Sequence, residues 1–189
     1  MRPLLSLLTA AVLVATTPAN AVAAPDATDW NALAPDGIVL FRHATAPGVG
    51  DPANFSLGDC TTQRNLDATG RTAAAAIGDA SHAHGIRVGM VLSSQWCRTR
   101  ETADLAFPGR ATAEPVFNSF FDHAAGEAQQ TAAARALLAH WKGPGVLVVV
   151  THQVNITALT GVVPRPGEGV VVEPSGNGLK VVGRIAAGR

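Results

Sequence analysis

Two histidines and two arginines stand at or just beyond the ends of short apolar runs, and their chemistry suits work on a phosphate group. These residues are Arg42, His43, Arg98 and His152. Arginine binds a phosphate dianion through a planar fork with permanent charge, and histidine is a nucleophile or proton carrier near neutral pH. A single such residue at a strand end is more often structural than catalytic. Four at matching positions favour one shared site, and their types predict phosphoryl transfer through a phosphohistidine.

The apolar runs predict the strands that would bring these four residues together. Residues 37–41, 88–92 and 146–150 are short and continuously apolar, as buried parallel strands are. In sheets built from alternating strands and helices, ligands bind at the carboxyl ends of the strands. We therefore expect the four side chains to meet at one edge of the sheet.

The remaining pattern alternates strands and helices and predicts an α/β fold. We expect a three-layer αβα sandwich with a mostly parallel central sheet. Asp67 is a predicted N-cap and Gly85 a predicted stop for the first long helix. The further predicted elements are helices at about 68–84, 98–107, 128–141 and 155–160, a weak strand at 114–117, and a closing hairpin of 169–173 with 179–184.

A long loop follows the first strand and is expected to contact substrate. Residues 44–60 contain three glycines and two prolines, and long loops in compact domains are often functional. Just beyond the loop, Arg64 could form a structural ion pair or reach the rim of the pocket. For Trp96, packing is the favoured role and covering the pocket is the alternative.

The N-terminus has the layout of a secretory signal peptide. Arg2 is followed by an apolar run over residues 4–15 and by small residues through Ala24. The apolar run is shorter than the roughly 20 residues that a membrane span needs. We therefore expect a signal peptide at 1–24, a mature domain at 25–189, and a secreted or periplasmic protein with no membrane attachment after cleavage.

Export would place the two cysteines in an oxidising compartment. Cys60 and Cys97 are the only cysteines of the chain, so a disulfide between them is a hypothesis, with two unpaired thiols as the alternative. Neither residue begins the Cys-x5-Arg pattern of a phosphatase loop, so a cysteine nucleophile is not expected.

Four segments together resemble the histidine phosphatase (phosphoglycerate mutase-like) superfamily. Residues 40–44 (LFRHA) resemble its N-terminal Arg-His-Gly motif, with Ala44 in place of glycine as in some small phosphatases of the superfamily. Residues 93–103 (SSQWCRTRETA) resemble its Ser-x-x-x-Arg-x-x-x-Thr-Ala motif. Residues 59–71 resemble the entry to its first long helix, and residues 150–152 resemble its second-histidine strand end. The matches occur in the order of that superfamily.

The resemblance implies a role for each of the four residues. His43 would be the nucleophile that takes the phosphoryl group, while Arg42, Arg98 and His152 would bind the phosphate oxygens. Surrounding cations disfavour protonation of His43 and keep one ring nitrogen free, and a backbone carbonyl is the expected partner of the other. No metal or cofactor is expected, because the arginines neutralise the charge.

The general acid is where the sequence departs from the mutase-like pattern. Residues 117–119 stand where a glutamate is expected, and Asp122 is the nearest carboxylate, with Glu127 and Asp59 as more distant candidates. A leaving alkoxide needs a proton, so Asp122 is the candidate acid. The alternative for Asp122 is a solvated loop carboxylate.

These observations predict an exported, metal-independent phosphatase that acts on small phosphomonoesters. A mutase-like phosphotransferase and a catalytically silent protein that binds a phosphorylated ligand are the alternatives. Nucleic acid is not an expected partner, because the formal net charge is zero, aromatic residues make up 5% of the chain and tyrosine is absent.

Overall fold

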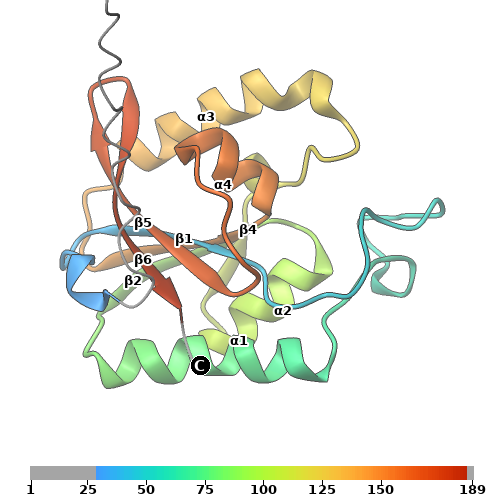
Figure 1. Cartoon of the computed structure of the whole chain (residues 1–189), viewed down its shortest axis with the longest axis horizontal. Helices are drawn as coiled ribbons and strands as arrows, with labels where there is room; N and C mark the ends of the chain where they lie inside the picture. The colour runs from blue at the N-terminus through green and yellow to red at the C-terminus, as the bar shows by residue number, and fades with distance from the viewer. Residues whose placement is uncertain (1–28, 187–189) are drawn as a thin grey trace, which may run out of the picture.

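A six-stranded mixed sheet lies at the centre of the protein in its computed structural model, which describes residues 29–186 (Figure 1). Its strands are β1 (Ile38–Arg42), β2 (Val88–Ser93), β3 (Ala111–Ala113), β4 (Val146–Thr151), β5 (Glu168–Ser175) and β6 (Gly178–Ala186). They lie in the order β3-β2-β4-β1-β5-β6. The first four strands in this order, β3, β2, β4 and β1, are parallel to one another, and β5 runs antiparallel to both β1 and β6.

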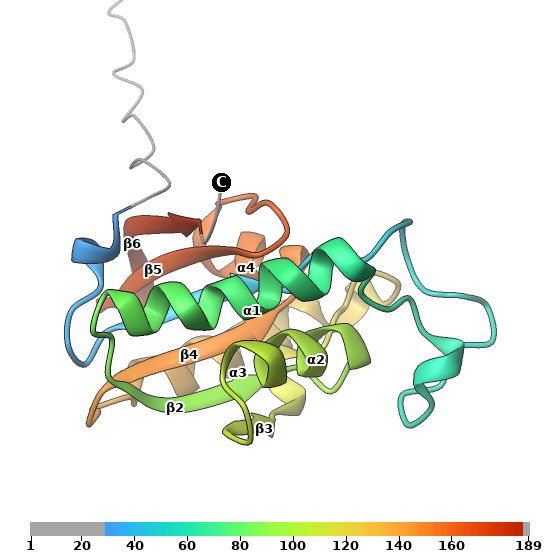
Figure 2. The same cartoon turned by 90° about the horizontal axis from the view of Figure 1, so that it is seen from below.

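Two helices cover each face of the sheet. Figure 1 shows α3 (Glu127–Ala139) and α4 (Gln153–Thr160) above the sheet and α1 (Ala68–Ala83) and α2 (Cys97–Ala106) below it. Figure 2, seen from below, places α1 and α2 in front of the strands. Four short 3₁₀ turns complete the described elements: η1 (Trp30–Ala32), η2 (Cys60–Thr62), η3 (Pro115–Phe117) and η4 (Ala124–Gly126). The predicted αβα sandwich is confirmed.

The two cores explain why the central strands are apolar without interruption. In β1, Val39 and Phe41 face one core and Leu40 faces the other, because side chains alternate across a strand. Every residue of β4 is buried for the same reason. Burying an aliphatic or aromatic side chain contributes about 1.5–3 kcal/mol. Burial on both faces therefore stabilises the central strands and holds the residues at their ends in place.

The ends of α1 follow the predicted signals. The Asp67 carboxylate accepts a hydrogen bond from the Gly70 N–H at 2.6 Å, which satisfies one of the free donors in the first turn. After the helix, Gly85 takes a φ of +66°, a left-handed conformation that ends a helix at little steric cost for glycine.

One predicted strand is wrong. The sequence favours a strand at 114–117, whereas β3 lies at Ala111–Ala113 and Pro115–Phe117 forms the turn η3. Pro115 has no N–H to donate to a strand ladder, and the Glu114 side chain accepts from the Val116 N–H and starts the turn. The apolar pattern there reflects the full burial of Phe117 in the core rather than a strand. Helix α4 also begins at Gln153, two residues before its predicted start.

Cys60 and Cys97 form a disulfide that spans 37 residues of chain. This is the pairing that the sequence left as a hypothesis.

Within residues 29–186, no helix has both the length and the apolar character to cross a membrane. The predicted signal peptide at 1–24 lies outside the described residues.

Candidate active site

The ends of β1 and β4 hold the two histidines side by side. Arg42 and Thr151 are register partners on these parallel strands. One residue further on, the His43 N–H donates to the Thr151 carbonyl at 2.9 Å. The His43 and His152 rings consequently meet edge to face, with centroids 5.6 Å apart.

Strand β2 supplies the third side of the site. It pairs with β4, and beyond its end the Ser94 N–H donates to the Val150 carbonyl at 3.0 Å. The chain then turns into α2, whose second residue is Arg98, 3% exposed. The structure thus brings Arg42, His43, Arg98 and His152 to one cavity of about 180 Å³.

His43 is held as a neutral imidazole with one nitrogen available. Its Nδ1 lies 2.7 Å from the carbonyl oxygen of Ala44, so Nδ1 carries the hydrogen and donates it there. Burial, followed by the charges of Arg98, Arg42 and Arg64, outweighs this hydrogen bond and lowers the pKa of His43 to about 3. The Nε2 lone pair is therefore free for nucleophilic attack at neutral pH.

His152 is also kept neutral. Its Nε2 lies 2.8 Å from the Ser94 hydroxyl, and its ring meets the Trp96 ring edge to face. Burial is the main cause that lowers the pKa of His152 well below the usual value, and the neighbouring His43 and arginines add to it. The neutral ring has one donor and one acceptor nitrogen.

Three guanidinium groups line the cavity. Arg42 donates through Nη1 to the Pro164 carbonyl at 3.0 Å, and Arg64 is held by the carbonyls of Gly50 and Ala46. The Nε atoms of Arg42 and Arg98 are buried and have no hydrogen-bond partner. Buried donors normally find acceptors, so these two guanidinium groups keep hydrogen-bonding capacity that the protein itself does not use.

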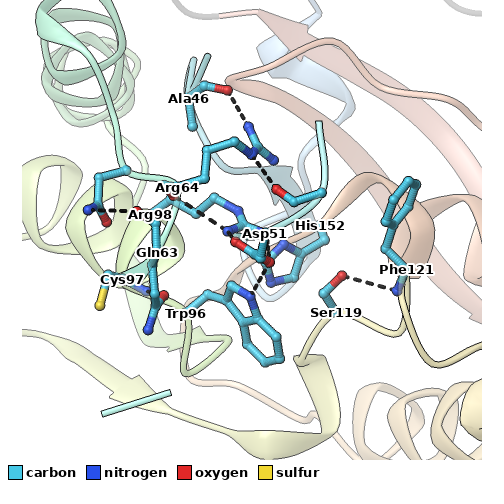
Figure 3. Close-up of polar contacts among 12 residues, drawn as sticks. Ala46, Asp51, Gln63, Arg64, Trp96, Cys97, Arg98, Ser119, Phe121 and His152 are labelled. Carbon is cyan, nitrogen blue, oxygen red and sulfur yellow. Dashed lines mark hydrogen bonds and ion pairs between the residues drawn. The ribbon is translucent and has the colours of Figure 1, made fainter. Parts of the chain in front are cut away.

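Asp51 is the carboxylate of the cavity, and the sequence analysis did not single it out. Its Oδ1 lies 2.6 Å from Arg98 Nη1 and its Oδ2 lies 3.1 Å from Arg98 Nη2, while Trp96 Nε1–H donates to Oδ2 at 2.9 Å (Figure 3). Burial raises the pKa of Asp51, but the Arg98 and Trp96 hydrogen bonds and the Arg98 charge outweigh it and hold the pKa below the usual value. With three arginines, one carboxylate and neutral histidines, the lining carries a net charge of +2.

Comparison with solved structures identifies this arrangement of strands and helices. A protein histidine phosphatase, SixA, solved with tungstate, has a TM-score of 0.57 at 15% sequence identity over 80% of this chain and 97% of its own. A phosphoserine phosphatase variant from Entamoeba histolytica with phosphoserine scores 0.55 at 10% identity over 78% and 95%. Phosphoglycerate mutase from Thermus thermophilus scores 0.52 at 16% identity over 72% and 92%.

The fold is that of the histidine phosphatases. No family model matches the sequence, and neither does any curated protein.

The predicted acid, Asp122, lies beside Gly50 and Phe121 at the exposed edge of the cavity. Asp122 is exposed and is not among the lining residues, although its neighbour Phe121 is. Glu127 and Asp59 are exposed as well. A sequence signal for Asp51 was available, because Asp51 and Asp59 are the two acidic residues of the predicted loop at 44–60. Strand-end spacing could not find it, since its position depends on how that loop folds back.

Several contacts fold that loop back over the site. The disulfide fastens Cys60 to the first residue of α2, directly before Arg98. Gln63 accepts from the Cys97 N–H and donates to the carbonyls of Ser56 and Leu57. The Trp96 indole donates to Asp51 and its ring stacks on that of Phe55, with the centroids 5.1 Å apart, so Trp96 packs against the loop.

Two apolar side chains stand at the mouth of the cavity. Val49 is 87% exposed and Phe121 is 55% exposed, and both are among the lining residues.

Within residues 29–186, no cluster of three His, Cys, Asp or Glu side chains suited to a metal ion is found.

Proposed function

We propose that this protein is an exported, metal-independent phosphatase that hydrolyses phosphomonoesters through a phosphohistidine on His43. The observation that carries the proposal is the state of His43, whose Nδ1 is anchored on a backbone carbonyl and whose Nε2 is free. That ring lies in a small cavity with three arginines and a second histidine.

In the proposed first step, His43 Nε2 attacks phosphorus in line with the leaving oxygen. The Nδ1–H bond to Ala44 stabilises the positive charge that develops on the ring. Arg42, Arg98 and His152 hold the three remaining phosphoryl oxygens, and water then hydrolyses the phosphohistidine. Catalysis of phosphoryl transfer consists mainly of positioning and charge stabilisation, which this pocket of fixed guanidinium groups supplies.

The structural relatives support this chemistry. They include a protein histidine phosphatase that binds tungstate, a tetrahedral oxyanion like phosphate, and a phosphoserine phosphatase that binds phosphoserine. A mutase has the same fold and is the enzymatic alternative. A silent phosphate-binding protein is the other, and the free Nε2 of His43 argues against it.

Export is supported by two features. The signal-peptide layout of residues 1–24 predicts secretion, and the Cys60–Cys97 disulfide suits an oxidising compartment.

The test uses purified protein with p-nitrophenyl phosphate and several natural phosphomonoesters in the presence of a chelator. We expect release of inorganic phosphate and, after alkaline quenching, a phosphorylated peptide containing His43. His43→Ala should lower kcat/KM by at least about 10³-fold and abolish the phosphopeptide, because no other nucleophile replaces the ring. His82→Ala, which removes an exposed histidine of α1, is the matched control and should keep full activity.

Other outcomes decide against the proposal. Isomerisation of a substrate without net phosphate release would indicate a mutase. Binding without turnover would indicate the silent protein, and activity only after metal addition would contradict metal independence.

A further inference from the structure

Asp51 occupies a position in the cavity that phosphate binding would change directly. Its side chain is 8% exposed, and that of its partner Arg98 is 3% exposed. It bonds both terminal nitrogens of the Arg98 guanidinium, yet the Nε–H of Arg98 is left without a partner. An anion that binds Arg98 would therefore share one guanidinium with the Asp51 carboxylate.

A bound phosphoryl group that shares the Arg98 guanidinium would change which form of the Asp51 carboxyl group, ionised or protonated, is favoured. In the structure the charged and polar groups around it are Arg98 and Trp96 of the α2 segment, Arg64 beyond the loop, and Arg42, His43 and His152 at the strand ends. The arginines favour the ionised carboxylate. A phosphoryl dianion would cancel their charge and bring like charge close to the carboxylate, which favours uptake of a proton.

We propose that Asp51 is the proton donor to the leaving oxygen of the substrate, an inference that rests on the phosphatase function proposed above. The P–O bond to the leaving group breaks as the P–Nε2 bond to His43 forms, and the Asp51 proton passes to the leaving oxygen. In the second step, water attacks phosphorus, its proton returns to the Asp51 carboxylate, and the P–Nε2 bond breaks. Departure of phosphate restores the Arg98–Asp51 pair and returns the proton to solvent.

The surroundings favour Asp51 over Asp122 for this task. Asp51 lies inside the cavity, while Asp122 is exposed outside the lining. A proton donor has to lie within hydrogen-bond reach of the leaving oxygen of a substrate bound in the cavity. Trp96 and Arg98 fix the Asp51 carboxyl there by three hydrogen bonds.

The experiment compares substrates whose leaving groups differ in their need for a proton. p-Nitrophenolate leaves without one, whereas the alkoxide of an alkyl phosphate such as β-glycerophosphate does not. We expect Asp51→Asn to lower kcat/KM for the alkyl phosphate by roughly 10²–10⁴-fold and for p-nitrophenyl phosphate by less than about 10-fold. Asp51→Glu should restore part of the alkyl phosphatase activity.

Asp79→Asn, on the exposed side of α1, is the matched carboxylate control and should leave both rates unchanged. Asp122→Asn is measured beside it. A selective loss of alkyl phosphatase activity in Asp122→Asn rather than Asp51→Asn would overturn the proposal. Equal losses on both substrates in Asp51→Asn would also overturn it, since they would show that Asp51 only positions Arg98.

Two further outcomes are decisive. If Asp51→Asn does not fold, a series of phosphomonoesters on the unmodified protein replaces it, and a steep fall of kcat/KM with rising leaving-group pKa would contradict a proton donor. If the unmodified protein hydrolyses none of the substrates, the proposed phosphatase function is wrong. If it hydrolyses them and Asp51→Asn does so equally well, only the proposed role of Asp51 is wrong.

Discussion

At the scale of single residues, burial among like charges determines what the two histidines can do. A solvent-exposed imidazole changes charge near neutral pH. His43 and His152 are each 3% exposed and face three arginines, so both remain neutral where an ordinary histidine would be partly protonated. The arginines that would bind an anion in the proposed function therefore also keep the His43 ring neutral.

This environment predicts the titration of the His43 ring. Nitrogen-detected NMR should show His43 as the neutral Nδ1–H tautomer throughout pH 5–8, with protonation only near its lowered pKa of about 3. His43→Gln identifies the resonance. In the unfolded chain the ring takes up its proton near pH 6.5, so His43 contributes stability fully above that pH and loses it as the pH falls towards 3. A His43 titration midpoint near 6.5 in the folded protein would contradict the burial and charge argument.

At the scale of elements, α1 packs closely against two neighbouring backbone segments. A Cβ added at Gly70 would lie 2.1 Å from the Thr45 carbonyl oxygen, and one at Gly78 would lie 2.1 Å from that of Ala106, at the end of α2. Glycine lowers helix propensity, but its lack of a Cβ allows the close backbone contact at these two positions. The contact at Gly70 also supports the chain two residues after His43.

Gly78→Ala tests the close approach of α1 to α2. Alanine is the better helix former by about 1 kcal/mol, yet we expect the free energy of unfolding to fall by about 1–3 kcal/mol because the helices must separate. Urea unfolding measures this change. Gly126→Ala is the matched control, since its added Cβ meets nothing within 4 Å. A Gly78→Ala protein more stable than the original would refute the contact.

At the scale of the whole molecule, the disulfide connects the long loop to the sheet-and-helix framework. It closes 37 residues of chain between the loop and α2, and that stretch includes all of α1 and β2. Such a cross-link reduces the conformational freedom of the unfolded chain. It also keeps the segment that carries Asp51 beside Arg98.

Removal of the disulfide should therefore destabilise the protein and loosen the site together. For Cys60→Ser combined with Cys97→Ser, we expect the free energy of unfolding to fall by about 3–4 kcal/mol, as a closed loop of this length implies. Urea unfolding with and without reductant measures it. Reductant should lower the stability of the original protein and leave the double variant unchanged. Equal stability of the two proteins under oxidising conditions would contradict this prediction.

The sequence by itself determined the layered fold and the four residues at the strand ends. Arg42, His43 and His152 follow directly from strands that are buried on both faces, because parallel strands end at one edge and the apolar runs mark where they end. Arg98 could be placed in the same way, since it lies in the first turn of the helix after β2.

Only the tertiary structure decided which carboxylate enters the cavity. Asp122 is near the expected acid in sequence but is exposed, whereas Asp51 is carried inward by a loop without regular periodicity. Such a loop is positioned by long-range contacts: the disulfide at Cys60, the carbonyls that hold Arg64, and the indole of Trp96. Local sequence patterns specify strands and helices, but they do not specify how a loop of glycine and proline residues packs against partners far along the chain.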